Sequence, residues 1–435
     1  MANFFHRRRR TIGSRDRRFL SETVYSAFRH KSFLSAWLQE TKGAENAEIL
    51  VLFAAAAENL LSSDEFRNAL EKTGGPAVSA EELYKDLRDK KLPPRLEFAS
   101  REGEWAVRFS FPEWLLERWF KRYGEQECRK LLEICQERPP LVVRANLLKT
   151  SRAKLMGYFR KKGYEVAETK KSSTGIVFAR RENLFDGEEF REGLFEVQDE
   201  GSQLLCEAVH PQPGEVIWDV CAGGGGKSLA FAASMQNKGR IIATDIRSWK
   251  LDELKRRAVR AGIYNIFPAD LASMDTIREM KGGADKILVD APCSGTGTLR
   301  RNPDARWKLS EEKIRACRDD QIKIVQKALP YLKKCGKLFY ATCSLEPEEN
   351  EEVVRLLMEK NEGVRLVKAD GNKPSPQPSP RGRGENKEKE DLQIPSPYGR
   401  GQGEGDSKID EDGFLRFLPQ RDGTDGFFMA VFEKN

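Results

Sequence analysis

The sequence of 435 residues predicts an α/β protein built around a doubly wound, Rossmann-like parallel sheet, with a small α/β subdomain and an all-helical region before it. Three observations support this prediction. From about residue 193, short apolar runs alternate with helical stretches, which is typical of a parallel sheet covered on both faces. Between residues 19 and 137, apolar side chains recur at helical spacing. Residues 138–192 mix short extended and helical segments with many basic side chains.

The N-terminal region opens with a basic arm, residues 1–18, that carries seven arginines. Such an arm can neutralise phosphates or can be a solvated tail, and the sequence leaves both interpretations open. Residues 19–137 then predict an accessory domain made of helices. One helix starts after Pro112 and stops at Gly124, and the next ends before Pro139 and Pro140.

The basic subdomain, residues 138–192, predicts extended segments at 141–144, 163–166 and 175–179 and a helix at 152–162. Lysines and arginines crowd the stretch 149–171. A run of charge is commonly a solvated face, but its place beside the sheet domain favours RNA contact.

The sheet domain, residues 193–371 with 409–435, predicts strands at 216–220, 240–244, 286–289 and 337–342 and a weaker one at 263–267. Helices are expected at 249–261 and 310–334. Residues 372–408 are rich in proline and glycine and contain a partial repeat of the sequence PSPQPSPRGRGE. A segment of this composition cannot bury a core, so the sequence predicts a disordered insertion.

Composition excludes several classes of protein. Hydrophobic residues make up 39% and charged residues 33%, the net charge is +7, and no apolar run is long enough to span a bilayer. Only His6, His30 and His210 are available to a Ser-His-Asp triad, and none lies near a nucleophile elbow. The eight cysteines form no CxxC pair. We therefore expect a cytoplasmic protein without a metal site or membrane segment.

The first chemical motif is Asp219-Val-Cys-Ala-Gly-Gly-Gly-Gly-Lys-Ser228, between a predicted strand and a helix. Glycines let the backbone approach a ligand and present amides at a helix N-terminus. The P-loop pattern GxxxxGK[ST] fails here only because Cys221 replaces its first glycine, so an NTPase is a real alternative. The predicted cofactor loop consists of Cys221, Ala222, Gly223, Gly224, Gly225, Gly226 and Lys227.

Asp245 favours a nucleoside cofactor over an NTPase. It ends the next predicted strand, where an acidic side chain binds the ribose hydroxyls of a nucleoside cofactor. The dinucleotide pattern GxGxxG fails because Ser228 occupies its last position. A nucleoside cofactor without pyrophosphate, S-adenosylmethionine, fits better. The simpler alternative is that Asp245 caps the following helix.

Two cysteine motifs follow later strands, Asp290-Ala-Pro-Cys-Ser-Gly-Thr-Gly297 and Ala341-Thr-Cys-Ser344. Cys293 and Cys343 would therefore meet at adjacent strand ends. A thiolate there can add to an electron-poor ring carbon, and Asp290 can hydrogen-bond the same ring.

With these motifs in place, the sequence closely resembles the Sun-type family of RNA (cytosine-5)-methyltransferases, in its bacterial ribosomal-RNA branch. The resemblance runs from about residue 112 to 361 and resumes at Phe414. Beyond the motifs above, it rests on Pro112-Glu-Trp-Leu115, Pro139-Pro-Leu-Val-Val-Arg-Ala-Asn-Leu-Leu-Lys149, Val197-Gln-Asp-Glu-Gly-Ser-Gln203, Arg300-Arg-Asn-Pro-Asp304 and Thr342-Cys-Ser-Leu-Glu-Pro-Glu-Glu-Asn350. The N-terminal helices are similar in placement to the family's NusB-like RNA-binding domain.

The resemblance implies an S-adenosylmethionine-dependent methyltransferase domain that acts on a cytidine of RNA, by preference small-subunit (16S) ribosomal RNA, as a monomer. It makes Cys343 the nucleophile, Cys293 the thiol of product release and Asp290 the residue that binds cytosine and borders the cofactor. It places Asp245 at the ribose and Asp270 near the adenine. Two alternatives stay open, a P-loop RNA-dependent ATPase and an inactive RNA-binding assembly factor.

The chain departs from the family pattern in its cofactor loop, where Gly224 replaces a proline and Gly223 an alanine. Asn302 stands where the family often has histidine. Loss of the proline makes the loop more flexible, which we expect to weaken cofactor binding without abolishing it.

Overall fold

The computed structural model describes residues 12–41, 47–73, 79–270, 282–369, 410 and 412–435. The chain divides into two compact units. The helical unit is Met1–Arg138 with Leu299–Lys308, and the sheet unit is Pro139–Thr298 with Leu309–Asn435. The arginines at positions 7–10 and the predicted insertion at 372–408 lie outside the described residues.

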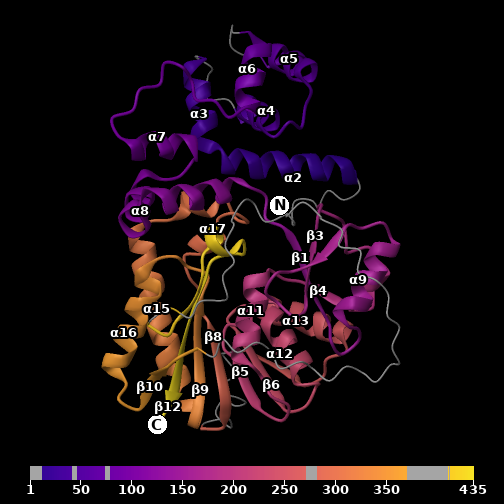
Figure 1. Ribbon diagram of the computed structural model, residues 1–435, viewed down its shortest axis with the longest axis vertical. Helices are drawn as coiled ribbons and strands as arrows, with labels where there is room; N and C mark the ends of the chain where they lie inside the picture. The colour runs from indigo at the N-terminus through magenta and orange to yellow at the C-terminus, as the bar shows by residue number, and fades with distance from the viewer. Residues whose placement is uncertain (1–11, 42–46, 74–78, 271–281, 370–409, 411) are drawn as a thin grey trace. The chain divides into compact units, whose positions relative to one another are not determined.

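In the helical unit, α3 to α6 pack around an apolar core that includes Phe33, Phe53 and Phe66. Its last helix breaks at Gly124 (φ +74°), as the sequence predicts. The first helix begins at Ser14, earlier than the predicted domain boundary at residue 19. The helices are α2 (Ser14–Arg29), α3 (Lys31–Glu40), α4 (Ala47–Ala57), α5 (Ser63–Lys72), α6 (Ala80–Arg88), α7 (Arg101–Arg108) and α8 (Glu113–Gln136) (Figure 1).

The segment 299–308 belongs to the helical unit although the flanking chain belongs to the sheet unit. Its anchor is Arg306, which is fully buried with its guanidinium 3.9 Å from the centroid of the Phe111 ring. The same guanidinium donates hydrogen bonds to the carbonyls of Phe109 and Ser110. A buried arginine needs such partners, and they account for the placement of this segment.

Within the sheet unit, a small antiparallel sheet has the strand order β2-β3-β1-β4. Its core is a cluster of aromatic rings in which Phe159 contacts Phe178 and Phe195. The strand β4 was not predicted, and it extends this sheet past the expected boundary at residue 192. The elements are β1 (Leu141–Ala145), α9 (Arg152–Lys161), β2 (Val166–Glu168), β3 (Gly175–Phe178), α10 (Glu188–Arg191) and β4 (Phe195–Val197).

The main sheet follows the order β10-β12-β9-β8-β5-β6-β7, and β11 pairs with β12. Strands β9, β8, β5, β6 and β7 are parallel neighbours, whereas β12 runs antiparallel to β9 and β10. The predicted doubly wound sheet is therefore confirmed. The strands are β5 (Val216–Asp219), β6 (Arg240–Asp245), β7 (Ile266–Asp270), β8 (Ala284–Asp290), β9 (Leu332–Thr342), β10 (Val364–Val367), β11 (Leu415–Phe417) and β12 (Phe427–Lys434).

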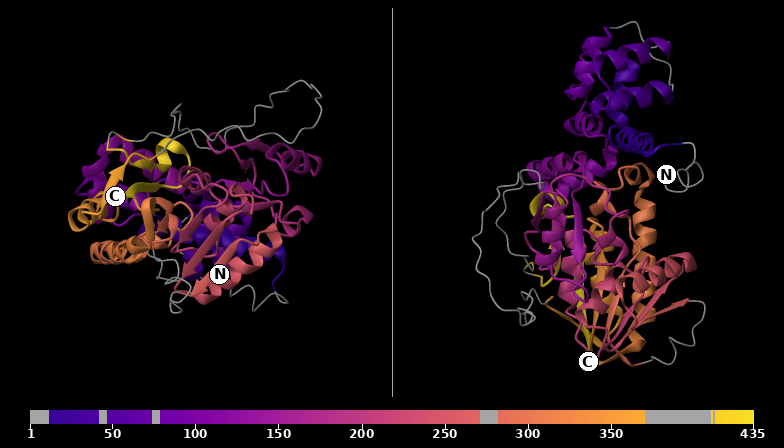
Figure 2. Two further views of the ribbon diagram at one scale, coloured as in Figure 1. Left: turned by 90° about the horizontal axis from the view of Figure 1, so that it is seen from below. Right: turned by 90° about the vertical axis from the view of Figure 1, so that its right-hand side faces the viewer.

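Helices cover both faces of the main sheet (Figure 1). One core, which includes Leu205, Phe231 and Ala258, joins the sheet to α11 (Glu200–Val209), α12 (Gly226–Ser234) and α13 (Ser248–Ala261). The other face packs on α15 (Glu311–Ala328) and α16 (Glu351–Lys360), seen in orange in Figure 1 and Figure 2. A short α17 (Pro419–Asp422) precedes β12.

The predicted helix 310–334 is too long at its C-terminal end. The helix α15 stops at Ala328, Leu329–Tyr331 forms a 3-10 turn, and β9 starts at Leu332. Pro330 explains the difference, because it lacks the amide hydrogen that would continue the helical hydrogen bonds.

Over the described ranges, no helix combines the length and apolar character needed to cross a bilayer. Within the same ranges, no three His, Cys, Asp or Glu side chains gather closely enough to hold a metal ion.

Candidate active site

The carboxyl ends of five neighbouring strands bring the predicted residues to one edge of the main sheet. Asp219 ends β5, Asp245 ends β6, Asp270 ends β7 and Asp290 ends β8, and Cys343 follows the last residue of β9. Ligands of open α/β sheets bind at this edge. Asp245 and Asp270 are partners in the register of β6 and β7.

The glycine loop connects β5 to α12. Gly225 caps the helix with φ +82°, and a Cβ there would lie 2.5 Å from Cγ of Leu254, so only glycine fits. Gly223 also has a positive φ of +55°, and no atom lies within 4 Å of the point where its Cβ would stand. The loop thus offers bare backbone at a helix N-terminus, which suits close approach of a nucleoside cofactor.

Two arginines from other elements hold the carbonyls of this loop. Nη1 of Arg257 in α13 donates to the Gly224 carbonyl at 2.7 Å, while its Nη2 lies 3.0 Å from a carboxylate oxygen of the buried Glu196. Nη1 of Arg144 in β1 donates to the Gly226 carbonyl at 2.9 Å. Neither contact is predictable from the sequence, because each joins residues far apart in the chain. These two arginines hold a loop that has Gly224 where the family pattern has a proline.

Asp245 is buried and binds the backbone around it. Its carboxylate accepts hydrogen bonds from the Gly223 amide at 3.0 Å and from the Arg247 amide at 2.8 Å, and Nε of Arg247 lies 3.2 Å away. A carboxylate has about four acceptor positions, so one stays available to a ribose hydroxyl. Asp245 therefore holds the turn that precedes α13 without capping an amide of the helix itself, and it still has capacity for a ligand.

Lys227 points to Asp290, with 2.5 Å between Nζ and Oδ2. Burial disfavours the charged ammonium, but the carboxylate of Asp290, with smaller effects from Cys206 and Asp219, outweighs it and raises the pKa of Lys227. In a P-loop this lysine reaches phosphates. Here its partner is a carboxylate at the end of β8.

Asp219 lies beneath the loop and is 1% exposed. Oγ of Ser228 donates to its Oδ2 at 2.6 Å, whereas its Oδ1 has no hydrogen-bond partner among the described residues. Burial raises the pKa of Asp219 to about 6.

The two cysteines meet as the sequence predicts, with 3.3 Å between Sγ of Cys293 and Sγ of Cys343. The hydrogen bond with Cys343, burial and the nearby Glu349 all raise the pKa of Cys293 well above its usual value. Either sulfur can donate in this contact.

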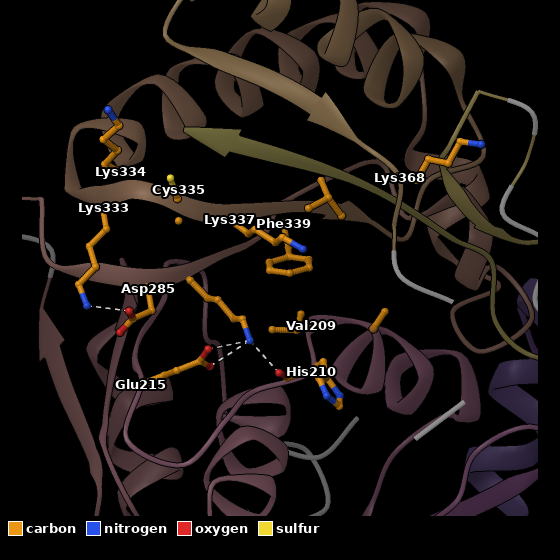
Figure 3. Close-up of a pocket in the computed structure, with 14 residues that line it drawn as sticks. Val209, His210, Glu215, Asp285, Lys333, Lys334, Cys335, Lys337, Phe339 and Lys368 are labelled. Atoms are coloured by element: carbon orange, nitrogen blue, oxygen red, sulfur yellow. Dashed lines mark hydrogen bonds and ion pairs between the residues drawn. The ribbon is translucent and has the colours of Figure 1, made fainter. Parts of the chain in front are cut away.

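A separate pocket of about 280 Å³ lies beside the amino ends of β5, β8 and β9 (Figure 3). Lysines dominate its lining, but Lys333 pairs with Asp285 at 2.6 Å and Lys286 with Glu215 at 2.9 Å. It contains none of the predicted site residues and lies at the opposite edge of the sheet from them.

Comparison with known proteins agrees with this geometry. The family described as "16S rRNA methyltransferase RsmB/F" matches residues 206–433, and its ferredoxin-like domain matches residues 111–184. A probable ribosomal RNA small subunit methyltransferase B of Bacillus subtilis is 30% identical over 337 residues, which cover 76% of this chain and 67% of the relative.

Two solved structures are similar over much of the chain. The crystal structure of PH0851 has a TM-score of 0.73 at 26% identity and covers 99% of this chain and 93% of its own. A methyltransferase homologue from Pyrococcus horikoshii has a TM-score of 0.61 at 28% identity and covers 78% of this chain and 100% of its own. With the strand-end cysteines and the glycine loop in place, the chain belongs to the RsmB/F family of S-adenosylmethionine-dependent 16S rRNA methyltransferases.

Proposed function

We propose that this chain methylates carbon-5 of a cytidine in 16S ribosomal RNA, through a covalent adduct between Cys343 and carbon-6 of the base. The observation that carries the proposal is the 3.3 Å approach of the two cysteine sulfurs at the carboxyl ends of β8 and β9. The curated relative is a ribosomal RNA small subunit methyltransferase, which supports the choice of RNA.

The electronics of cytosine explain the need for a thiolate. Carbon-5 is a weak nucleophile, and addition of the Cys343 thiolate to carbon-6 converts the ring to an enamine-like form whose carbon-5 is electron-rich. When bound, S-adenosylmethionine would supply the methyl group to carbon-5, with the carbon–sulfur bond of the sulfonium breaking to leave S-adenosylhomocysteine. Loss of the carbon-5 proton and then of the thiolate restores the aromatic ring as 5-methylcytosine.

The other residues take separate roles in this proposal. Asp290, fixed by Lys227, binds the ring nitrogen side of the cytosine and stabilises the adduct. Cys293 assists release of the finished product. The glycine loop, Asp245 and Asp270 hold the nucleoside part of the cofactor. A paired base is out of reach, so the target lies in a loop or is flipped out.

Bisulfite sequencing of ribosomal RNA tests this function. A deletion strain should lack one 5-methylcytosine of 16S rRNA, and wild-type protein, but not Cys343→Ala, should restore it. An unchanged 16S pattern with a lost transfer-RNA methylation would contradict the substrate, and unchanged patterns in both RNAs would contradict the activity.

A further inference from the structure

Glu349 is a fully buried carboxylate directly beneath the two cysteine loops. It ends the 3-10 turn Pro347–Glu349 that follows β9, and its exposed fraction is 0%. Burying a charge is costly unless hydrogen bonds replace the lost water. The partners of Glu349 are therefore informative.

One oxygen of this carboxylate serves the loop of Cys293. Oε1 accepts the backbone amide of Ser294 at 2.7 Å and Nε2 of Gln321 at 3.0 Å, and the same Nε2 donates to the carbonyl of Pro292 at 3.0 Å. The residues on both sides of Cys293 are thus held, directly or through Gln321, by one side chain.

The other oxygen joins the two loops. Oε2 accepts the hydroxyl of Ser344, next to Cys343, at 2.6 Å, and it also accepts the hydroxyl of Ser294. Both serines are buried, at 1% and 7% exposure. Hydrogen bonds to a carboxylate are roughly twice as strong as neutral ones, so this bridge is stiff.

We propose that Glu349 is the positioning residue that sets the distance between the nucleophile loop and the release loop. The proposal deepens the proposed function and rests on it, because two thiols must act in turn on the same base. Without the carboxylate, two serine hydroxyls and two amide donors would each lose an acceptor. Backbone hydrogen bonds between the loops, from Gly297 to the Cys343 carbonyl and from Ala291 to the Ala341 carbonyl, would remain. The residues next to the two thiols would nevertheless lose their shared anchor, and a displacement of about 1 Å at a reacting group can cost on the order of 10²-fold in rate.

The test separates attack from release. Glu349→Asp keeps the charge but is one methylene too short to reach both loops. Ser344→Ala removes the bond next to Cys343, and Ser294→Ala removes the hydroxyl bond next to Cys293. Glu200→Asp is the matched control, because Glu200 is also buried (1% exposed) and accepts two backbone amides, of Lys171 and Ser172, away from the cysteines.

Each variant is mixed with a 16S rRNA transcript and S-adenosylmethionine in single turnover, and the protein–RNA adduct is followed on denaturing gels together with the methylated product. Glu349→Asp should form adduct on the order of 10²-fold more slowly than wild type. Ser344→Ala should slow formation mainly, and Ser294→Ala should slow adduct decay mainly. Glu200→Asp should leave both rates within a few-fold of wild type.

Melting temperatures separate this role from simple destabilisation. The proposal would be overturned if the rates of adduct formation and adduct decay fell together, in proportion to the loss of thermal stability. Wild-type adduct kinetics in Glu349→Asp would also overturn it. A wild-type protein that forms neither adduct nor product would overturn the proposed function and this proposal with it, whereas an active wild type beside an unaffected Glu349→Asp would overturn only this one.

Discussion

At the scale of single residues, the ion pair between Lys227 and Asp290 joins the glycine loop to the end of β8. The text Gly226-Lys227-Ser228 is compatible with a phosphate-binding loop or with a methyltransferase loop. Nζ of Lys227 lies 2.5 Å from a carboxylate at the end of β8, where it fixes Asp290. The match of this segment to the RsmB/F methyltransferase family, and not the loop sequence alone, separates the two interpretations.

Asp245→Ala should weaken binding of S-adenosylhomocysteine by about 1–3 kcal/mol, because a ribose hydroxyl would lose its acceptor and the Gly223 amide its partner. Isothermal titration calorimetry measures the effect. Asp252→Ala, an exposed aspartate on α13, is the control. An unchanged dissociation constant in Asp245→Ala would remove this residue from the cofactor site.

Asp219→Asn should alter how stability depends on pH. Burial raises the pKa of Asp219 from 3.8 to about 6, so between these values the folded state binds the proton more tightly than the unfolded state. The stabilisation from this proton is present near pH 4 and is lost as the pH rises to about 6.

The variant cannot lose that proton, so its stability relative to wild type should rise between pH 4 and pH 7, by roughly 3 kcal/mol. Denaturant midpoints at the two pH values measure the change. Asp252→Asn controls for the loss of a charge. A difference between variant and wild type that does not vary with pH would contradict the assignment.

At the scale of elements, the sequence was most informative where local pattern decides structure. The parallel strands β5, β6, β8 and β9 are apolar runs that end in polar residues, and the strand-end positions of Asp245, Asp290 and Cys343 follow from them. The sequence pattern did not predict β4, because this short strand depends on its pairing with β1. It also could not reveal the bridge through Glu349 or the contacts of Arg144 and Arg257, because burial and long-range hydrogen bonds are tertiary.

The cofactor loop is an element whose rigidity we expect to depend on an arginine from α13. Arg257→Met removes the donor to the Gly224 carbonyl while Glu196 keeps its ion pair with Arg260. Affinity for S-adenosylhomocysteine should fall about tenfold, since a hydrogen bond to a charged group contributes about 1.5–3 kcal/mol. Calorimetry measures the affinity of this variant and of Arg256→Met, in which an exposed neighbouring arginine is replaced. Equal affinities for the two variants would show that the loop does not need this contact.

At the scale of the whole molecule, the chain consists of two compact units, and the predicted insertion interrupts the sheet unit between β10 and β11. The described residues that flank it are hydrogen-bonded to one another, since the Ala369 amide donates to the Gly413 carbonyl at 3.1 Å. Ala369 and Gly413 are therefore close enough for a short linker to join the flanks.

Replacing residues 372–408 with a short Gly/Ser linker should leave the melting temperature and methyl transfer nearly unchanged, because the segment has almost no apolar side chains to bury and loop length has a small effect on stability. Thermal unfolding and a methyl-transfer assay check both properties. A fall of many degrees would show that the segment packs on the fold.

In the proposed mechanism Cys343 attacks the base and Cys293 releases it, and the covalent protein–RNA adduct distinguishes these two roles. Wild type, Cys343→Ala and Cys293→Ala are each incubated with 16S rRNA and S-adenosylmethionine and run on denaturing gels. Cys343→Ala should form no adduct and no product, whereas Cys293→Ala should accumulate an adduct that carries a methylated base. An adduct trapped by Cys343→Ala and absent from Cys293→Ala would reverse the two roles and contradict the account.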